Sequence, residues 1–124
     1  MRDDRFVYLS GPITARDGCT VEENVASAVK VYLALVAAGV PTFCPQLSAI
    51  FPSAWTQATY EQWMTQDLAV IARCSHLLLL PRWETSPGAM REKAYAEAIG
   101  VTVVGSIEAL VGDTAKEREC ERLS

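Results

Sequence analysis

The sequence predicts an α/β fold in which a parallel sheet of about four strands lies between layers of helices. Short apolar runs alternate along the chain with longer segments in which apolar residues recur at helical spacing. The run HLLLL at residues 76–80 has no polar alternation, which is typical of a strand covered on both faces. The 124 residues are 50% hydrophobic and 21% charged, which suits one domain over residues 1–124.

The first third of the chain predicts a strand followed by a helix. The apolar run FVYL at residues 6–9 forms the strand, which stops at the turn of residues 10–12. Thr20 and Glu23 have the spacing of a capping box, so a helix begins there. Apolar residues at helical spacing follow, and Gly39 suits the end of this helix.

The middle of the chain predicts two more strands separated by a helix. Residues 40–44, VPTFC, form the second strand, and residues 45–58 form a long loop of the kind usually found near function. A helix over residues 59–72 has apolar residues along one side. The run at residues 76–80 is the third strand, and residues 81–87 form a loop.

The last part of the chain predicts a helix, a strand and a short helix. The third helix begins at residue 88 or 89 and runs to residue 99, where Gly100 suits its end. Residues 101–104, VTVV, form the fourth strand, and Ser106 begins a short helix. Residues 116–124 are a charged mix, expected to form a marginal helix or a frayed end.

This order of elements predicts a flavodoxin-like or Rossmann-like three-layer sandwich. Right-handed crossovers favour the strand order 2-1-3-4. Ligands of such sheets bind at the carboxyl ends of the strands, near the point where the strand order reverses. The segments that reach this edge are residues 10–12, 45–59, 81–88 and 105–106.

Charge and cysteine content exclude several classes of protein. The net charge of -4 argues against a nucleic-acid polymer or an anionic membrane as partner, because both require basic surface. No apolar run approaches the roughly 20 residues of a membrane span, and residues 1–5 lack the apolar stretch of a signal peptide, so we expect a cytoplasmic protein. With one histidine and widely spaced cysteines, we expect reduced thiols and no metal site. The cysteines are Cys19, Cys44, Cys74 and Cys120.

Two polar features reach the ligand edge before the third helix. Ser10 and Gly11 follow the first strand directly, so their backbone amides can face a ligand. This turn is not the GxGxxG fingerprint, so no dinucleotide cofactor is expected. Asp67 lies beside the inward stripe of the second helix, either as a boundary carboxylate bonded to a backbone amide or as part of the site.

A third feature is the segment SPGAMRE at residues 86–92, which opens the third helix. The free amides and positive dipole end of this helix suit an anion or a sugar hydroxyl. The residues placed to bind it are Ser86, Gly88 and Ala89. Glu92 falls on the apolar face, where an unpartnered carboxylate is costly to bury. The alternative is that Glu92 complements the helix dipole or pairs in solvent with Arg91 or Lys93.

Several aromatic residues are candidates for stacking on a planar ligand. Trp55 and Trp83 lie on loops near the expected site and are favoured. For Tyr60 and Trp63, core packing or a subunit contact is favoured. The histidine, His76, opens the third strand at the opposite edge, so it is expected to be structural.

Three segments together resemble the nucleoside 2-deoxyribosyltransferase family. They are YLSGPIT, QDLAVIARCSHLLLL and SPGAMREKAYAEAIGVTVV, in this order, and the resemblance covers most of residues 6–104. It implies that Glu92 is the nucleophile that attacks C1′ of a sugar, forming a glycosyl-enzyme ester. It also implies that Tyr8 orients this nucleophile and that Asp67 assists the leaving base by proton transfer.

The resemblance leaves the substrate open between nucleosides and nucleotides. Ser86 stands where the transferases often carry an aspartate, and the nucleoside 5′-monophosphate N-glycosidases of the family have serine there to bind phosphate. Ser75, Lys93 and Tyr95 also depart from the family pattern.

Three functions therefore remain open. The chain is a transferase, a nucleotide hydrolase or a module that binds a nucleotide without chemistry. No cofactor or metal is expected for any of them. A homodimer is expected, because related enzymes complete their sites with a neighbour's residues and the second helix carries surplus aromatic residues.

Overall fold

A computed structural model describes residues 4–16 and 18–111. Its four strands form one parallel sheet in the order β2-β1-β3-β4, which confirms the predicted fold class and strand order. The register places Tyr8 between Phe43 and Leu77. The strands are β1 (Val7–Ser10), β2 (Thr42–Phe43), β3 (His76–Leu79) and β4 (Thr102–Val104).

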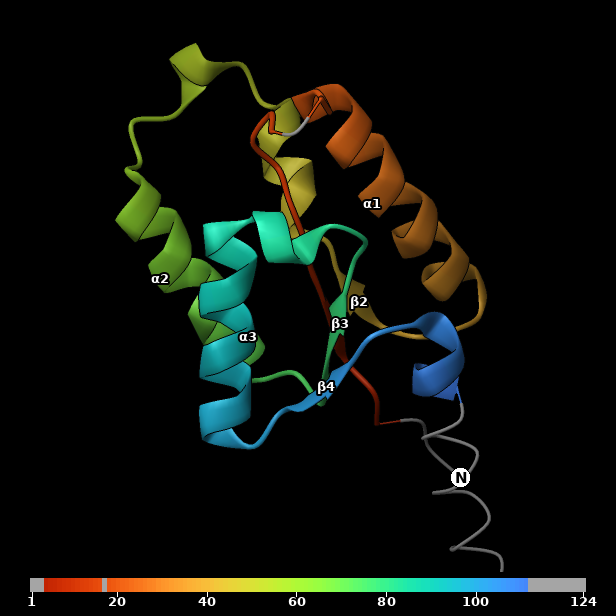
Figure 1. The fold of residues 1–124 in the computed structure, drawn as a ribbon. Helices are drawn as coiled ribbons and strands as arrows, with labels where there is room; N and C mark the ends of the chain where they lie inside the picture. The colour runs from red at the N-terminus through yellow and green to blue at the C-terminus, as the bar shows by residue number, and fades with distance from the viewer. Residues whose placement is uncertain (1–3, 17, 112–124) are drawn as a thin grey trace, which may run out of the picture.

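Helices cover both faces of this sheet. Helix α1 (Val21–Ala37) and the helical residues 107–111 lie on one face, and α2 (Tyr60–Ile71) and α3 (Pro87–Ile99) lie together on the other (Figure 1). Alternate residues of the strands supply the two cores. Those facing α1 include Val7, Leu9, Leu78 and Val104. Those facing α2 and α3 include Tyr8, Leu77 and Leu79.

The predicted helix ends are largely confirmed. Thr20 and Thr59 each cap a helix through a complete capping box, and Gly39 and Gly100 adopt left-handed conformations just after α1 and α3. Helix α3 begins at Pro87 rather than at residue 88 or 89. The ring of proline presets the helical φ angle, and the N–H that proline lacks has no acceptor at a helix start.

The two segments predicted as loops contain short 3-10 helices. These are η1 (Pro45–Ile50), η2 (Ser53–Trp55) and η3 (Trp83–Thr85). Pro45 begins the first of them, where its fixed φ again favours a helical turn. Such short turns carry no apolar periodicity, so the sequence pattern cannot reveal them.

The described residues include no helix that is both long and apolar enough to cross a membrane. Cys19, Cys44 and Cys74 form no disulfide among the described residues, and the latter two are buried. Cys120 and the tail of residues 116–124 lie outside the described residues.

Candidate active site

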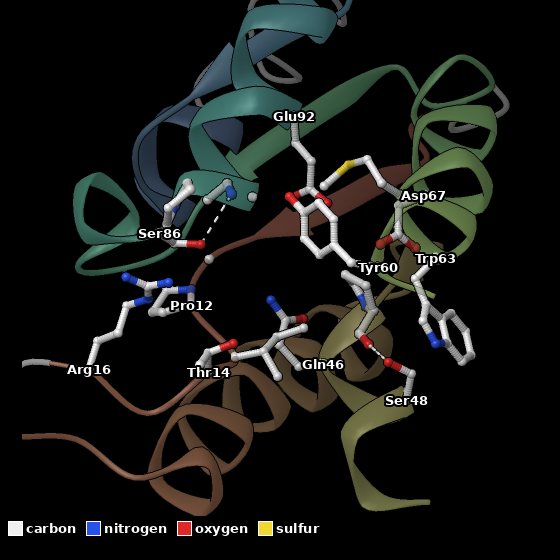
Figure 2. A pocket seen from close by; sticks show the side chains of 17 residues that line it. Pro12, Thr14, Arg16, Gln46, Ser48, Tyr60, Trp63, Asp67, Ser86 and Glu92 are labelled. Atoms are coloured by element: carbon white, nitrogen blue, oxygen red, sulfur yellow. Dashed lines mark hydrogen bonds between the residues drawn. The ribbon is translucent and has the colours of Figure 1, made fainter. Parts of the chain in front are cut away.

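A cavity of about 530 Å³ lies at the carboxyl ends of β1 and β3, at the predicted edge of the sheet (Figure 2). Its walls come from residues 11–16 after β1, the start of η1, one side of α2 and the first turns of α3. The strand order reverses at β1, so this is the crevice in which doubly wound sheets bind ligands.

Glu92 is the centre of the site. Its side chain is buried, and each of its carboxylate oxygens accepts a hydrogen bond from β1. The Tyr8 hydroxyl donates to Oε2 at 2.7 Å, and the Ser10 hydroxyl donates to Oε1 at 2.8 Å. Tyr8 and Ser10 are two residues apart on one strand, so both side chains point to the same face of the sheet and meet α3.

The role of Ser10 differs from the prediction. It was expected to offer its backbone amide to a ligand, but its fully buried side chain holds Glu92. Gly11 does line the cavity, and a Cβ there would come within 2.7 Å of the Cβ of Leu80. The glycine is therefore required by close packing of the chain after β1.

The alternative in which Glu92 forms an ion pair in solvent with Arg91 or Lys93 is wrong. The guanidinium of Arg91 pairs with Glu61 at 2.8 Å, and the ammonium of Lys93 pairs with Glu97 at 3.1 Å. Burial raises the pKa of Glu92 to about 7, although the hydrogen bonds from Tyr8 and Ser10 lower it and the charge of Asp67 raises it further. The carboxyl group is thus held close to its ionisation point at neutral pH.

Asp67 is the second carboxylate of the cavity. It is half-buried on α2, and burial raises its pKa to about 6, while its interaction with the Tyr8 hydroxyl lowers it. Burial and the two carboxylates raise the pKa of Tyr8 well above its usual range, so this phenol remains protonated. Tyr8 is therefore a permanent donor between two carboxylates that titrate near neutrality.

The start of α3 forms the end of the cavity away from Asp67. The Ser86 hydroxyl accepts a hydrogen bond from the Ala89 N–H at 3.1 Å, so this predicted ligand-binding amide is already occupied. Gly88 also lines the cavity, and its N–H, at the second helical position, has no acceptor within the helix. In Figure 2, Arg16 and Ser86 lie at one end, Asp67 lies at the other, and Glu92 lies between them.

The aromatic residues of the cavity are not the ones that were favoured. Tyr60 and Trp63 line it from the first turn of α2. Trp55 is 76% exposed on η2, and Trp83 packs against the core beneath α3, with the Lys93 ammonium 5.5 Å from its ring centre. Neither lines the cavity. The 3-10 turns carry both indoles away from the sheet edge, which the loop predictions did not include.

Sequence reasoning missed four polar residues of the cavity, which are Thr14, Arg16, Gln46 and Ser48. Gln46 is fully buried, and its side-chain amide donates to the Leu9 carbonyl at 3.3 Å, which fixes η1 against β1. Arg16 is an exposed cation on the segment after β1. Arg16 and Gln46 both lie in segments that follow a strand on the ligand side, which is a signal that could have identified them.

A family model described as a domain of unknown function, DUF4406, matches residues 5–105. The chain belongs to this family. The DUF4406 match runs from just before β1 to just after β4, so it includes every residue that lines the cavity. A search of curated proteins gave no match.

Replacing Glu92 by glutamine is expected to stabilise the protein at alkaline pH. The folded-state pKa of about 7 lies above the ordinary value of 4.5, so the folded protein binds this proton more tightly than the unfolded chain. The free energy of unfolding of the wild type is therefore highest below pH 4.5, where Glu92 is protonated in both states, and it falls as the pH rises through 7. The loss amounts to about 3 kcal/mol at pH 8 and less than about 1 kcal/mol at pH 5.

Thermal unfolding at the two pH values measures this effect. The Glu92→Gln variant should melt about 10 °C above the wild type at pH 8 and close to it at pH 5. The exposed Glu108, replaced in the same way, is the matched control and should change neither value. Equal melting of wild type and Glu92→Gln at pH 8 would contradict the raised pKa of Glu92.

Proposed function

We propose that this protein cleaves or transfers at the N-glycosidic bond of a nucleoside or nucleotide, with Glu92 as nucleophile. One observation carries the proposal: a buried carboxylate, held on both oxygens by Tyr8 and Ser10, faces a cavity that contains a second carboxylate. Evolved cores rarely bury an acid without such a use, because burial costs stability. The cavity of about 530 Å³ also suits a ligand of nucleoside size.

The proposed reaction has two displacement steps. Glu92 attacks C1′ of the sugar while the bond from C1′ to the base nitrogen breaks, and the base leaves with the bonding electrons and a proton from Asp67. An ester then joins Glu92 to C1′. In the second step a new base or a water molecule attacks C1′, Asp67 takes its proton, and Glu92 leaves as the carboxylate.

The pKa values of the two carboxyl groups suit a pair that shares one proton near neutral pH. The first step needs one ionised and one protonated carboxyl group, and the two pKa values of about 7 and about 6 place the pair in a singly protonated state near pH 6.5, with the proton mainly on Glu92. The reactive form is the less populated one, in which Asp67 carries the proton and Glu92 is ionised. Tyr8, which stays protonated, donates to Glu92 throughout. Activity is therefore expected to be highest near neutral pH.

A nucleoside 5′-monophosphate N-glycosidase is the second candidate. The cationic side chain of Arg16, the hydroxyl of Ser86 and the N–H of Gly88 line the end of the cavity away from Asp67. A phosphate at this end would receive a charge-assisted hydrogen bond and the positive end of the helix dipole. With the base at Asp67, the sugar would then lie against Glu92.

We further propose that the protein is a cytoplasmic homodimer. Three large aromatic side chains on the η1, η2 and α2 side are half-exposed or more: Phe51, Trp55 and Tyr60. Tyr60 also lines the cavity, so a second copy on this surface would cover one wall of the site. Light scattering should give twice the mass of 13.5 kDa, and a monomer at all concentrations would rule this out.

Chromatography of purified protein incubated with mixed deoxynucleosides and deoxynucleoside monophosphates tests the proposed function. Release or exchange of a base by the wild type, absent with Glu92→Ala, is the expected result. Exchange between bases indicates a transferase, and release from monophosphates alone indicates the hydrolase. Folded protein that binds these compounds, seen as a raised melting point, but leaves all of them intact would instead indicate a binding module.

A further inference from the structure

Arg82, in the loop that follows β3, has an unfavourable backbone conformation. It lies between β3 and η3 with φ at 66°, and among the described residues it is the one non-glycine residue with a positive φ. Such a backbone crowds the Cβ of any residue except glycine. Residues held in this way persist where the surroundings impose the conformation, and they gather at functional sites.

The side chain of Arg82 reaches the first turn of α1. Its Nη2 donates to the Oδ1 of Asn24, which is buried. Asn24 in turn donates from Nδ2 to the carbonyl oxygens of Ile13 and Thr14, at 3.2 and 3.1 Å. A guanidinium group can only donate hydrogen bonds, so the Asn24 amide must turn its oxygen toward Arg82. The Asn24 amide nitrogen then faces the segment after β1 and donates to it.

This segment is a wall of the candidate site. Ile13 and Thr14 line the cavity, and so does Arg16 two residues later. We propose that Arg82 is a positioning residue that acts through Asn24 to hold residues 13–16 in the geometry that binds substrate. The inference rests on the proposed function for its kinetic part, and on the hydrogen bonds alone for its structural part.

Two features of the Arg82 environment are energetically unfavourable. The Nη1 of Arg82 is buried without a hydrogen-bond partner among the described residues. A cation is also unfavourable beside the N-terminus of a helix, although the nearby Glu23 offsets part of this effect. A strained backbone and an incompletely bonded cation are retained together, which favours a positional role for the contact with Asn24.

Two variants separate the positional role from a structural one. Arg82→Gly removes the guanidinium and relieves the backbone, since glycine adopts this φ freely, so the fold should be preserved. Asn24→Asp keeps an acceptor for Arg82 but loses both donors to Ile13 and Thr14. Arg73→Gly is the matched control, because Arg73 is exposed, lies just after α2 and bonds the Ala69 carbonyl of that helix at 2.9 Å.

Hydrogen exchange measured by mass spectrometry tests the structural part without any substrate. Amides of residues 13–16 should exchange about tenfold faster in Arg82→Gly and in Asn24→Asp, with the strands and α3 unchanged. Arg73→Gly should leave this segment as in the wild type. Unchanged exchange of residues 13–16 in both site variants would overturn the proposal, whatever reaction the protein catalyses.

Steady-state kinetics on the substrate found by chromatography test the functional part. Both site variants should raise KM about tenfold and keep kcat within about threefold, because residues 13–16 bind substrate and carry no chemistry. An unchanged KM in variants with faster exchange would overturn the positioning role. A wild type without turnover would refute the proposed function alone, since the exchange result stands independently.

Discussion

The Glu92→Gln variant is expected to lose turnover by about 10⁴-fold or more while its affinity for the ligand changes only a few-fold. Glutamine has almost the same shape as glutamate, and its amide can still bond the hydroxyls of Tyr8 and Ser10. It cannot form an ester with C1′, so the first displacement stops. Binding measured by calorimetry and turnover measured by base release separate the two effects.

Matched variants show whether the loss belongs to the nucleophile. Glu108→Gln removes an exposed carboxylate and should retain full activity. Glu92→Asp keeps the charge but withdraws it from Tyr8 and Ser10, so a large loss is expected there as well. Retention of more than about a tenth of the wild-type rate by Glu92→Gln would exclude Glu92 as nucleophile.

The Asp67→Asn variant is expected to reduce kcat by about 10²- to 10⁴-fold for natural bases. An asparagine side chain cannot transfer the proton that a departing base needs. A synthetic glycoside with a weakly basic leaving group needs no such proton, so its cleavage should fall by less than about tenfold. Rates for the two kinds of leaving group, measured in parallel, give the test.

The pH profile of Asp67→Asn should change in two ways. The decline of kcat/KM above neutral pH should disappear, because this limb reports loss of the one proton that the pair shares and that Asp67 must donate. The rise on the acid side should then follow the ionisation of Glu92 alone, so it should move from near pH 6 toward the pKa of Glu92, about 7. Equal losses for strong and weak leaving groups, with both limbs unchanged, would show that Asp67 only shapes the cavity.

The fold was predictable because its signals are local. Apolar runs such as residues 76–80 identify buried strands, and the capping box at Thr20 marks the start of a helix. The alternation of strands and helices then limits the topology, and the strand order follows from crossover handedness. The same reasoning placed Asp67 and the start of α3 at the correct edge of the sheet.

The details of the site depend on contacts between distant segments. The hydrogen bonds from Tyr8 and Ser10 to Glu92 join residues more than 80 positions apart, and only the packing of β1 against α3 brings them together. Side chains alternate along a strand, so the sequence alone places the hydroxyls of Tyr8 and Ser10 on the same face of β1. The sequence does not show that this face packs against α3.

The positions of the aromatic residues show the same limit. Trp83 and Trp63 are both near the expected edge in sequence, yet only Trp63 lines the cavity. The direction of the Trp83 indole is set by the 3-10 turn η3, and that of Trp63 by the first turn of α2. Such single turns are too short to produce a periodic pattern of apolar residues. The link from Arg82 through Asn24 is hidden for the same reason.

Intact-protein mass spectrometry tests the central claim most directly. A nucleoside with fluorine at C2′ slows both displacement steps, because fluorine destabilises the oxocarbenium-like transition state, and a glycosyl-enzyme intermediate can then accumulate. The proposed mechanism predicts that the wild-type mass rises by that of the fluorinated sugar and that peptide mapping places the adduct on Glu92. Base release without any adduct, or an adduct that persists in Glu92→Gln, would contradict it.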